Sequence, residues 1–301
     1  MARPADPVNS ESPGGVRDRQ GVRQWPGVVA RWGAAGEPLS PGAPVAAAAA
    51  AAQAGGSGPL VLVCEHASNR AAAPWGALGL SAQALQAHIA WDRGALGLAR
   101  ELAVRLAPVC GGAVLVHAPL SRLIHDLNRS PDRPGAMPER SETQDIPGNR
   151  GLSPADRQAR VDAVYLPFHA TLQAEIARAL ATQRRPVVLT VHSFTPTWHG
   201  TPRTVEFGVI HDADPVLAQA IVAQAAGTGL VTVLNAPYSA ADDVTHMLRQ
   251  HAIPCHLPNA MLELRNDLIA TPAAQGAMAD RLAPVLARAI ATVTEVACPA
   301  S

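Results

Sequence analysis

Residues 59–70 read PLVLVCEHASNR, an apolar run rich in β-branched residues that passes directly into polar side chains. A short run of this kind predicts a buried strand. Five further stretches share the pattern: AVLVHA (113–118), PVVLTVH (186–192), VEFGVI (205–210), LVTVL (230–234) and AMLEL (260–264). Segments with helical periodicity lie between them, at 82–107, 154–183, 214–227, 239–250 and 273–292. This alternation predicts an α/β fold in which helices cover both faces of a largely parallel sheet.

The charge balance limits the classes of function. The chain has 301 residues with 24 basic and 24 acidic side chains, and every basic one is arginine. Without lysine, Schiff-base chemistry and the Walker and kinase lysines are excluded. Zero net charge argues against nucleic acid as a partner. No apolar run approaches the roughly 18 residues of a membrane span, so we expect no membrane partner either.

The first 57 residues differ in composition from the rest. They are rich in Pro, Gly and Ser and contain seven successive alanines, Ala46 to Ala52. We expect 1–57 to be disordered or weakly ordered, with docking of the stretch from Trp25 to Trp32 on the body as an alternative. Residues 58–296 are expected to form a single domain, which is ample length for one core.

Cysteine usage and the N-terminal residues bear on the cellular compartment. The four cysteines are far apart and form no CxxC pair, which argues against a disulfide framework and against a thiolate zinc site. The opening residues MARPADPVNSESPGG have no hydrophobic stretch of the kind a signal peptide needs. We therefore expect reduced thiols and a cytoplasmic location.

Polar residues follow several of the predicted strands. His66 follows the first, His192 ends the strand 186–192, Glu263 lies inside 260–264, and Asn128 and Arg129 follow the strand 113–118. In sheets of this kind ligands bind beyond the carboxyl ends of the strands. A glutamate inside an apolar strand is costly to bury unless it is paired, hydrogen-bonded or bound to metal.

Together these residue types fit a zinc hydrolase, although each alone fits a structural role as well. Zinc takes about three nitrogen or oxygen ligands from the protein and leaves a position for water. A neighbouring glutamate can accept the proton of that water and pass it to the leaving nitrogen. An arginine beside an asparagine can hold a substrate carboxylate, because guanidinium binds carboxylate in a bidentate fork.

These residues also carry a family resemblance. From about 59 to 294 the chain resembles the N-formylglutamate amidohydrolase family, through VLVCEHASNR (61–70), HIAWDRGALGLARELA (88–103), SRLIHDLNRSP (121–131), PGNRGLS (147–153), YLPFH (165–169), HSFTP (192–196) and ELRNDLI (263–269). That family in turn resembles the zinc carboxypeptidases. The resemblance implies a three-layer α/β/α architecture with a mixed, mostly parallel sheet, of the phosphorylase/hydrolase-like or zinc exopeptidase-like kind.

The resemblance also implies roles for individual residues. His66 and His192 correspond to zinc ligands, Asn128 and Arg129 to the carboxylate-binding pair, and Glu263 to the catalytic glutamate. Zinc carboxypeptidases place a glutamate ligand three residues after the first histidine, where this chain has Asn69.

The third ligand is therefore open. Asp92 is our first choice, because the WDRG segment is shared and lies on a predicted helix that can reach the strand ends. There, His88 and Asp92 are spaced i, i+4 on one helical face. Glu65, beside His66, is the second choice. A plain ion pair with Arg93 or Arg70 is the alternative reading of Asp92.

Several other residues have less specific expectations. Arg122 and Arg203 are candidates for a second carboxylate clamp, which a dicarboxylate substrate needs. His125 and Asp126 are expected to orient the turn before Asn128. His169 is expected to pack inside the structure. Three further histidines are expected to be structural or to face solvent, with a second metal site as the alternative: His246, His251 and His256.

The expected activity is zinc-dependent hydrolysis of an N-formyl or N-acyl amino acid. The resemblance implies N-formyl-L-glutamate as a substrate, cleaved to formate and the amino acid in histidine degradation. The alternatives are an amidase or carboxypeptidase acting on another acyl amino acid or on cell-wall peptide, and a non-catalytic binding protein on the same scaffold. The expected partner is thus a small molecule, and the expected cofactor is one zinc ion.

Overall fold

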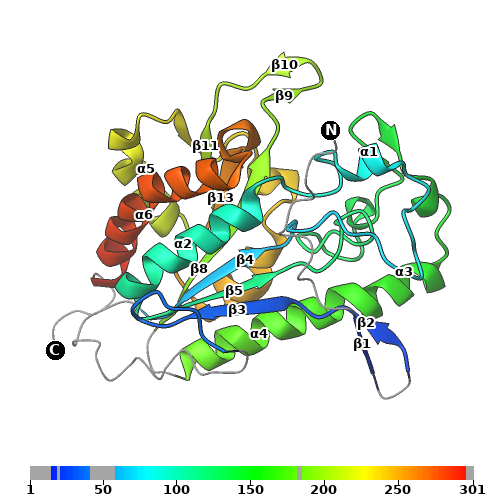
Figure 1. The fold of residues 1–301 in the computed structure, drawn as a ribbon, viewed down its shortest axis with the longest axis horizontal. Helices are drawn as coiled ribbons and strands as arrows, with labels where there is room; N and C mark the ends of the chain where they lie inside the picture. The colour runs from blue at the N-terminus through cyan, green and yellow to red at the C-terminus, as the bar shows by residue number, and fades with distance from the viewer. Residues whose placement is uncertain (1–14, 19–20, 41–57, 182–184, 296–301) are drawn as a thin grey trace.

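The computed structural model describes residues 15–18, 21–40, 58–181 and 185–295. A seven-stranded sheet forms its centre, in the order β12-β11-β13-β8-β4-β5-β3 (Figure 1). Its strands are β3 (Val28–Trp32), β4 (Leu60–Cys64), β5 (Ala113–His117), β8 (Val187–Phe194), β11 (Phe207–Ile210), β12 (Thr232–Leu234) and β13 (Asn259–Arg265). Three small hairpins lie outside it: β1 (Val16–Arg17) with β2 (Arg23–Gln24), β6 (Arg140–Ser141) with β7 (Gln144–Asp145), and β9 (Thr197–Trp198) with β10 (Thr201–Pro202).

The sheet is mixed but mostly parallel. Strands β5, β4, β8 and β13 are parallel to one another, whereas β3 is antiparallel to β5 and β11 is antiparallel to β13. The edge strand β12 runs parallel to β11. The carboxyl ends of four adjacent strands therefore meet at one edge of the sheet, as the sequence predicts.

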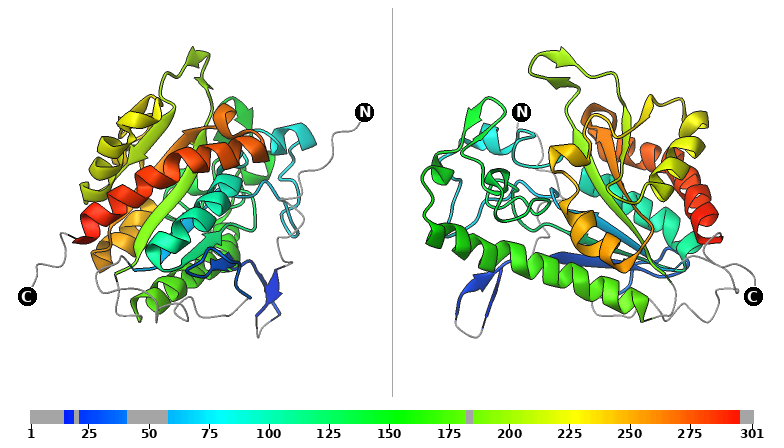
Figure 2. Two further views of the ribbon diagram at one scale, coloured as in Figure 1. Left: turned by 60° about the vertical axis from the view of Figure 1, so that its left-hand side comes forward. Right: turned by 180° about the vertical axis from the view of Figure 1, so that it is seen from behind.

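Helices cover both faces of the sheet. The α-helices are α1 (Ala82–Leu85), α2 (Ala95–Cys110), α3 (Pro154–Arg160), α4 (Leu166–Leu180), α5 (Val216–Ala225) and α6 (Pro272–Glu295). Helices α2 and α5 pack on one face with α6 across them, while α4 contacts β5 and the π-helical turn η8 (Leu248–Ala252) contacts β13 (Figure 2). Shorter turns complete the chain: η3 (Pro134–Ala136), η4 (Pro147–Asn149), η5 (Val161–Tyr165), η6 (Ala226–Thr228), η7 (Ala240–Asp242), η9 (Ile253–Cys255) and η10 (Asn266–Ile269). The expected three-layer α/β/α arrangement is confirmed.

The predicted helix 82–107 is wrong as one element. It ends after one turn at α1 and restarts at α2, with residues 86–94 in turns between them. Gly94 causes the restart, because its φ of 81° is left-handed and a Cβ there would lie 2.3 Å from the carbonyl oxygen of Ile269. The backbone N–H of Asp92 donates to the carbonyl of His66 at 2.9 Å, which draws this segment to the end of β4.

The predicted helix 239–250 is also wrong. The segment contains the single turn η7 and an irregular stretch before η8. Asp243 adopts a left-handed φ of 59°, and this conformation interrupts any helix through the segment.

Part of the N-terminal segment is ordered against the body. Strand β3 pairs with β5 over its whole length, and Trp25 is buried, with the guanidinium of Arg70 5.1 Å from its ring centre. Residues 25–32 therefore dock on the body, as the alternative to a disordered segment predicts. The alanine run, Ala46 to Ala52, lies outside the described residues.

The core is aliphatic, in agreement with the low aromatic content. Every residue of β4 and β5 is buried, as are nine residues of α2. Among the described residues, the structure has no helix whose length and apolar character suffice to cross a bilayer.

Candidate active site

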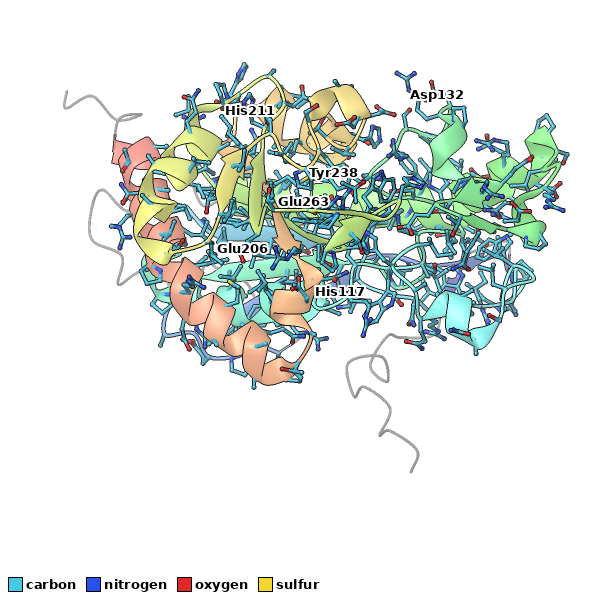
Figure 3. All side chains as sticks on the ribbon, turned by 90° about the horizontal axis from the view of Figure 1, so that it is seen from above. His117, Asp132, Glu206, His211, Tyr238 and Glu263 are labelled. Carbon is cyan, nitrogen blue, oxygen red and sulfur yellow. The ribbon has the colours of Figure 1, made fainter. Side chains whose placement is uncertain are left out.

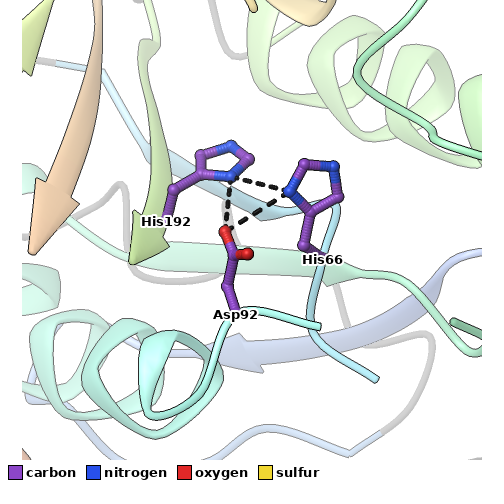
Figure 4. A group of neighbouring side chains, drawn as sticks. All are labelled: His66, Asp92 and His192. Atoms are coloured by element: carbon purple, nitrogen blue, oxygen red, sulfur yellow. Dashed lines mark hydrogen bonds and ion pairs between the residues drawn. The ribbon is translucent and has the colours of Figure 1, made fainter. Parts of the chain in front are cut away.

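The carboxyl ends of the parallel strands bring three predicted ligands together. His66 follows β4 by two residues, His192 lies in β8, and Asp92 comes from the turns before α2 (Figure 4). Each of the three is at most 4% exposed. The imidazole Nδ1 atoms of His66 and His192 lie 3.1 Å apart, and the Asp92 Oδ2 atom lies 3.3 Å and 3.0 Å from them respectively.

These three distances are compatible with a tetrahedral metal site. Ligand atoms about 2.05 Å from zinc at tetrahedral angles lie about 3.3 Å from one another. Among the described residues this is the one group of three or more potential ligands that could hold a metal ion. The candidate set is therefore two histidines and one carboxylate, with Asp92 in it and Asn69 outside it.

The outer nitrogen of each histidine faces a carboxylate. His66 Nε2 donates to Asp126 Oδ1 at 2.7 Å. His192 Nε2 lies 2.8 Å from Thr190 Oγ1 and 3.2 Å from Glu65 Oε2. With both Nε2 atoms protonated and no proton on either Nδ1, three acceptors converge, and a cation fits between them. Burial lowers the pKa of His192, but Glu65 and Asp92 hold that pKa well above its usual value, so this cluster favours a positive charge.

Glu65, the second choice for a ligand, lies behind His192 rather than in the cluster. It is fully buried and accepts a hydrogen bond from the Thr190 hydroxyl at 2.6 Å. Burial raises the pKa of Glu65, but His192 outweighs burial and holds that pKa below its usual value. Glu65 thus orients the ring of His192.

Asp126 has a larger part than sequence analysis expected. Besides His66, its carboxylate accepts from Arg122 at 2.7 Å and from the Asn128 backbone N–H at 3.0 Å. Burial alone would raise the pKa of Asp126, but Arg122 and His66 hold it well below its usual value. The prediction that Asp126 orients the Asn128 turn agrees with this contact, but the DLNR motif gave no sign of its bond to His66.

Glu263 lies beside the cluster. It pairs in register with His192 across parallel strands, so the two side chains point to the same face of the sheet. Glu263 is 5% exposed and its Oε2 atom has no hydrogen-bond partner. Burial raises the pKa of Glu263 to about 7, against the lowering effect of His192. A carboxylate with a pKa near neutrality and a free oxygen is suited to accept and release a proton.

A cavity of about 780 Å³ opens over these groups. The predicted site residues that line it are His66, Asp92, Arg122, Asn128, Arg129, His192, Arg203 and Glu263. Glu65 is absent from the lining. The cavity also contains Tyr238, which sequence analysis missed and whose side chain lies near Glu263 (Figure 3).

Two of the three arginines already have carboxylate partners. Arg122 contacts Asp126 and, at 3.4 Å, Asp92. Arg129 lies 3.7 Å from both Asp126 and Asp243 and donates to the Asp243 carbonyl at 3.2 Å.

The side chain of Asn128 is engaged as well. Its Nδ2 donates to the Val244 carbonyl, and its Oδ1 accepts from the Met247 backbone N–H at 2.9 Å. Asn128 therefore anchors the segment before η8 to the cavity wall. One amide hydrogen remains for a substrate.

Arg203 differs from the other two arginines. Its guanidinium lies 4.9–5.4 Å from the ring centres of Phe194, Trp198 and Tyr238, and it donates to the Tyr238 hydroxyl at 3.0 Å. In the part of the chain that the structure describes, no carboxylate forms an ion pair with it. Of the three, this cation is the most available for an anionic ligand.

The remaining histidines have structural contacts. His169 Nδ1 lies 2.7 Å from His251 Nε2, and His169 Nε2 donates to the Leu127 carbonyl at 3.1 Å. His246 Nε2 lies 2.7 Å from the Tyr165 hydroxyl, and His256 ends η9 in a left-handed turn. They are absent from the candidate metal group, so the structural interpretation describes them better than a second metal site.

His88 also has a contact that sequence analysis anticipated only in part. Its Nδ1 lies 3.6 Å from Asp92 Oδ1, although the pair stands in turns and not on a helical face. Burial lowers the pKa of His88 to about 4, so it is neutral at pH 7.

The fold and this cluster define an α/β protein with a candidate metal-hydrolase site. The chain belongs to the N-formylglutamate amidohydrolase family, whose model matches residues 58–270. The family makes it a hydrolase that acts on amide C–N bonds, with a function of the N-formylglutamate amidohydrolase type.

The solved structures that are similar to this chain include the following two. The gene product Atu2144 of Agrobacterium tumefaciens is 47% identical with a TM-score of 0.75, and the match covers 78% of this chain and 92% of that one. The N-formylglutamate amidohydrolase of Ralstonia eutropha JMP134 is 17% identical with a TM-score of 0.53, over 81% of this chain and 97% of that one. At this identity the second likeness concerns the fold alone. No curated protein matches the chain.

Proposed function

We propose that this protein is a zinc-dependent amidohydrolase that cleaves N-formyl or N-acyl amino acids, such as N-formyl-L-glutamate. The observation that carries the proposal is the triangle of His66 Nδ1, His192 Nδ1 and Asp92 Oδ2 beside Glu263. Its edges of 3.0–3.3 Å fit tetrahedral zinc, and two histidines with one carboxylate are an ordinary donor set for a catalytic zinc. When bound, such an ion lowers the pKa of a water and polarises the scissile carbonyl.

Glu263 is the proposed general base and acid. Its buried carboxylate accepts a proton from the attacking water and delivers it to the leaving nitrogen as the amide C–N bond breaks. The free Oε2 atom and the pKa of about 7 support both steps, because the group can take up and release a proton near neutral pH.

Arginines are the proposed anchors of the amino acid product. Arg129 and Arg203 hold substrate carboxylates, and Asn128 contributes its remaining amide hydrogen. Arg203 is the better supported of the two arginines, because its charge has no carboxylate partner among the described residues. Arg122 is committed to Asp92 and Asp126, so we assign it chiefly to holding those two carboxylates in place.

The test separates metal binding from proton transfer. A Glu263→Gln variant is expected to retain zinc at wild-type stoichiometry and to lose at least about a thousandfold in kcat on N-formyl-L-glutamate. A His66→Ala variant is expected to lose both zinc and activity. Near-wild-type turnover in the glutamine variant would refute the role of Glu263, and zinc content unchanged by His66→Ala would refute the ligand set.

The compartment remains a sequence-based prediction. It rests on the wide spacing of the four cysteines and on the polar opening residues.

A further inference from the structure

The cavity is larger than the smallest substrate requires. N-formylglutamate has 12 non-hydrogen atoms, and even at about 30 Å³ per atom, the volume of a liquid water, it would fill less than half of the 780 Å³. The outer part is lined by the tips of two hairpins, with Ser141 and Glu142 from β6–β7 and Trp198, His199 and Thr201 from β9–β10. Both hairpins project at the same end of the molecule (Figure 2).

Carboxylates outnumber arginines among the charged side chains that line the cavity. Among the described residues there, three are arginines and five are carboxylates: Arg122, Arg129, Arg203, Asp92, Asp126, Glu142, Asp242 and Glu263. With all five ionised, the formal sum is minus two before any cation binds, and a divalent ion only neutralises it. A dicarboxylate substrate would restore two uncompensated negative charges, whereas a substrate that carries an amine would leave fewer.

Glu142 is the carboxylate in this set without another task. Asp92 and Asp126 contact the histidines, Glu263 is the proposed base, and Asp242 accepts from Ser239 in a capping box. Glu142 is exposed at the tip of its hairpin, with a left-handed φ of 51°, and no described residue forms an ion pair with it. This φ follows from the two-residue turn that joins β6 to β7, and the turn places the Glu142 side chain in the cavity lining.

We propose that Glu142 forms an outer subsite that binds a positively charged group of the substrate. The substrates that gain from this subsite are N-acyl amino acids longer than N-formyl-L-glutamate, with an amine on the acyl group or on the side chain. The indole of Trp198, 37% exposed, offers apolar surface for the carbon chain between the amine and the scissile amide. This inference rests on the proposed hydrolysis and adds the chemical class of the substrate.

Two series of matched substrates test the subsite in the zinc-loaded protein. The side-chain series is N-formyl-L-ornithine, N-formyl-L-norleucine and N-formyl-L-glutamate. The acyl series is 4-aminobutanoyl-, pentanoyl- and succinyl-L-glutamate. In at least one series we expect kcat/KM for the amine to exceed that for its neutral isostere by roughly 1.5- to fivefold, the range for an exposed ion pair. The preference should shrink as ionic strength rises.

Variants assign this preference to one side chain. Glu142→Gln should abolish it and leave turnover of the neutral isosteres within about twofold. Asp145→Asn is the matched control, since it removes an acid of the same hairpin that pairs with Arg140 and Arg150 and does not line the cavity. The control should keep the preference.

Two results overturn the subsite: no amine preference in either series, or a preference that Glu142→Gln leaves intact. If N-formyl-L-glutamate is hydrolysed while either result holds, the subsite alone fails. If none of the six compounds is hydrolysed, the proposed function fails and the subsite with it.

Discussion

The bond between Asp126 and His66 makes a quantitative prediction about zinc affinity. In an Asp126→Asn variant the side chain keeps its size, but one of its two oxygens becomes an NH2 group, so either His66 Nε2, now at Oδ1, or Arg122, now at Oδ2, faces a donor instead of an acceptor. The negative charge that favours the protonated Nε2 is lost as well. Since a hydrogen bond to a charged acceptor contributes about 1 kcal/mol more than a neutral one, and since partners of metal-bound histidines typically contribute 10- to 100-fold in affinity, we expect zinc to bind about 10- to 100-fold more weakly.

The assay is a competition between the protein and a chromophoric chelator of known zinc affinity, at fixed pH. The free-energy change should be about 1.4–2.8 kcal/mol. Asp280→Asn is the control, because Asp280 lies on α6 with a side chain 70% exposed, pairs with Arg105 and does not line the cavity. It should leave zinc affinity unchanged. At saturating zinc the Asp126→Asn variant should regain most of its turnover. This result is expected if Asp126 only positions His66, and it is not expected if Asp126 takes part in the reaction.

A zinc dissociation constant within twofold of wild type in Asp126→Asn would refute this reasoning. It would mean that the 2.7 Å contact with His66 contributes nothing to the ligand geometry.

Three other perturbations give equally specific outcomes. Because activity requires the ionised Glu263 carboxylate, kcat/KM should fall as the pH drops through the pKa of this group. That pKa is about 7 without metal, and a bound cation lowers it, so the acid limb of the pH–rate profile lies below pH 7. A profile with no acid limb above pH 4 would contradict the assignment of Glu263 as the base. In the metal-free protein the raised pKa of Glu263 also makes the free energy of unfolding depend on pH. The contribution of the protonated carboxyl is complete below about pH 4.5 and is lost as the pH rises through 7. Chemical denaturation of the wild type and of Glu263→Gln at several pH values measures this difference. Arg203→Met should raise KM for N-formyl-L-glutamate at least tenfold and change kcat less. Arg203→Lys should restore only part of the lost affinity, because lysine lacks the bidentate fork of the guanidinium. An unchanged KM in both variants would exclude Arg203 from carboxylate binding. Gly94→Ala should lower the free energy of unfolding in urea by about 2 kcal/mol or more, because the alanine Cβ would lie 2.3 Å from the Ile269 carbonyl oxygen and the φ of 81° is strained for alanine. A loss below about 0.5 kcal/mol would show that the break before α2 has another cause.

The parts of the fold that the sequence predicts are those governed by local pattern. Each of the six apolar runs contains a strand of the central sheet, because a buried strand needs a continuous apolar run with β-branched residues. Strand β3 was not predicted, because its sequence VVARW (28–32) contains an arginine and so is not a continuous apolar run. Strand β3 lies at the edge of the sheet, where Arg31 pairs with Glu175 at 2.7 Å. The antiparallel direction of β11 relative to β13 also depends on connections that no local pattern shows.

The site divides in the same way. His66, His192 and Glu263 are predictable because each stands in or just after a strand whose carboxyl end lies at one edge of the sheet. Asp126 and Tyr238 come from irregular segments, and their places depend on contacts with residues far away in the chain. For Asn128, the motif predicts a polar residue at the cavity but not that both atoms of its amide hold the backbone at 244 and 247.

Asp92 shows how the proposed third ligand could be predicted from an incorrect helix. A ligand three residues after His66 would be positioned by the end of β4 alone, but Asn69 occupies that place. Asp92 is instead held by two backbone contacts, its own N–H to the His66 carbonyl at 2.9 Å and the Ser193 N–H to its Oδ2 at 3.2 Å. Both contacts come from the strands that carry the other two ligands, so the carboxylate reaches the cluster only where the chain leaves helical geometry. The helix break that helical periodicity failed to predict is therefore the feature that completes the proposed zinc site.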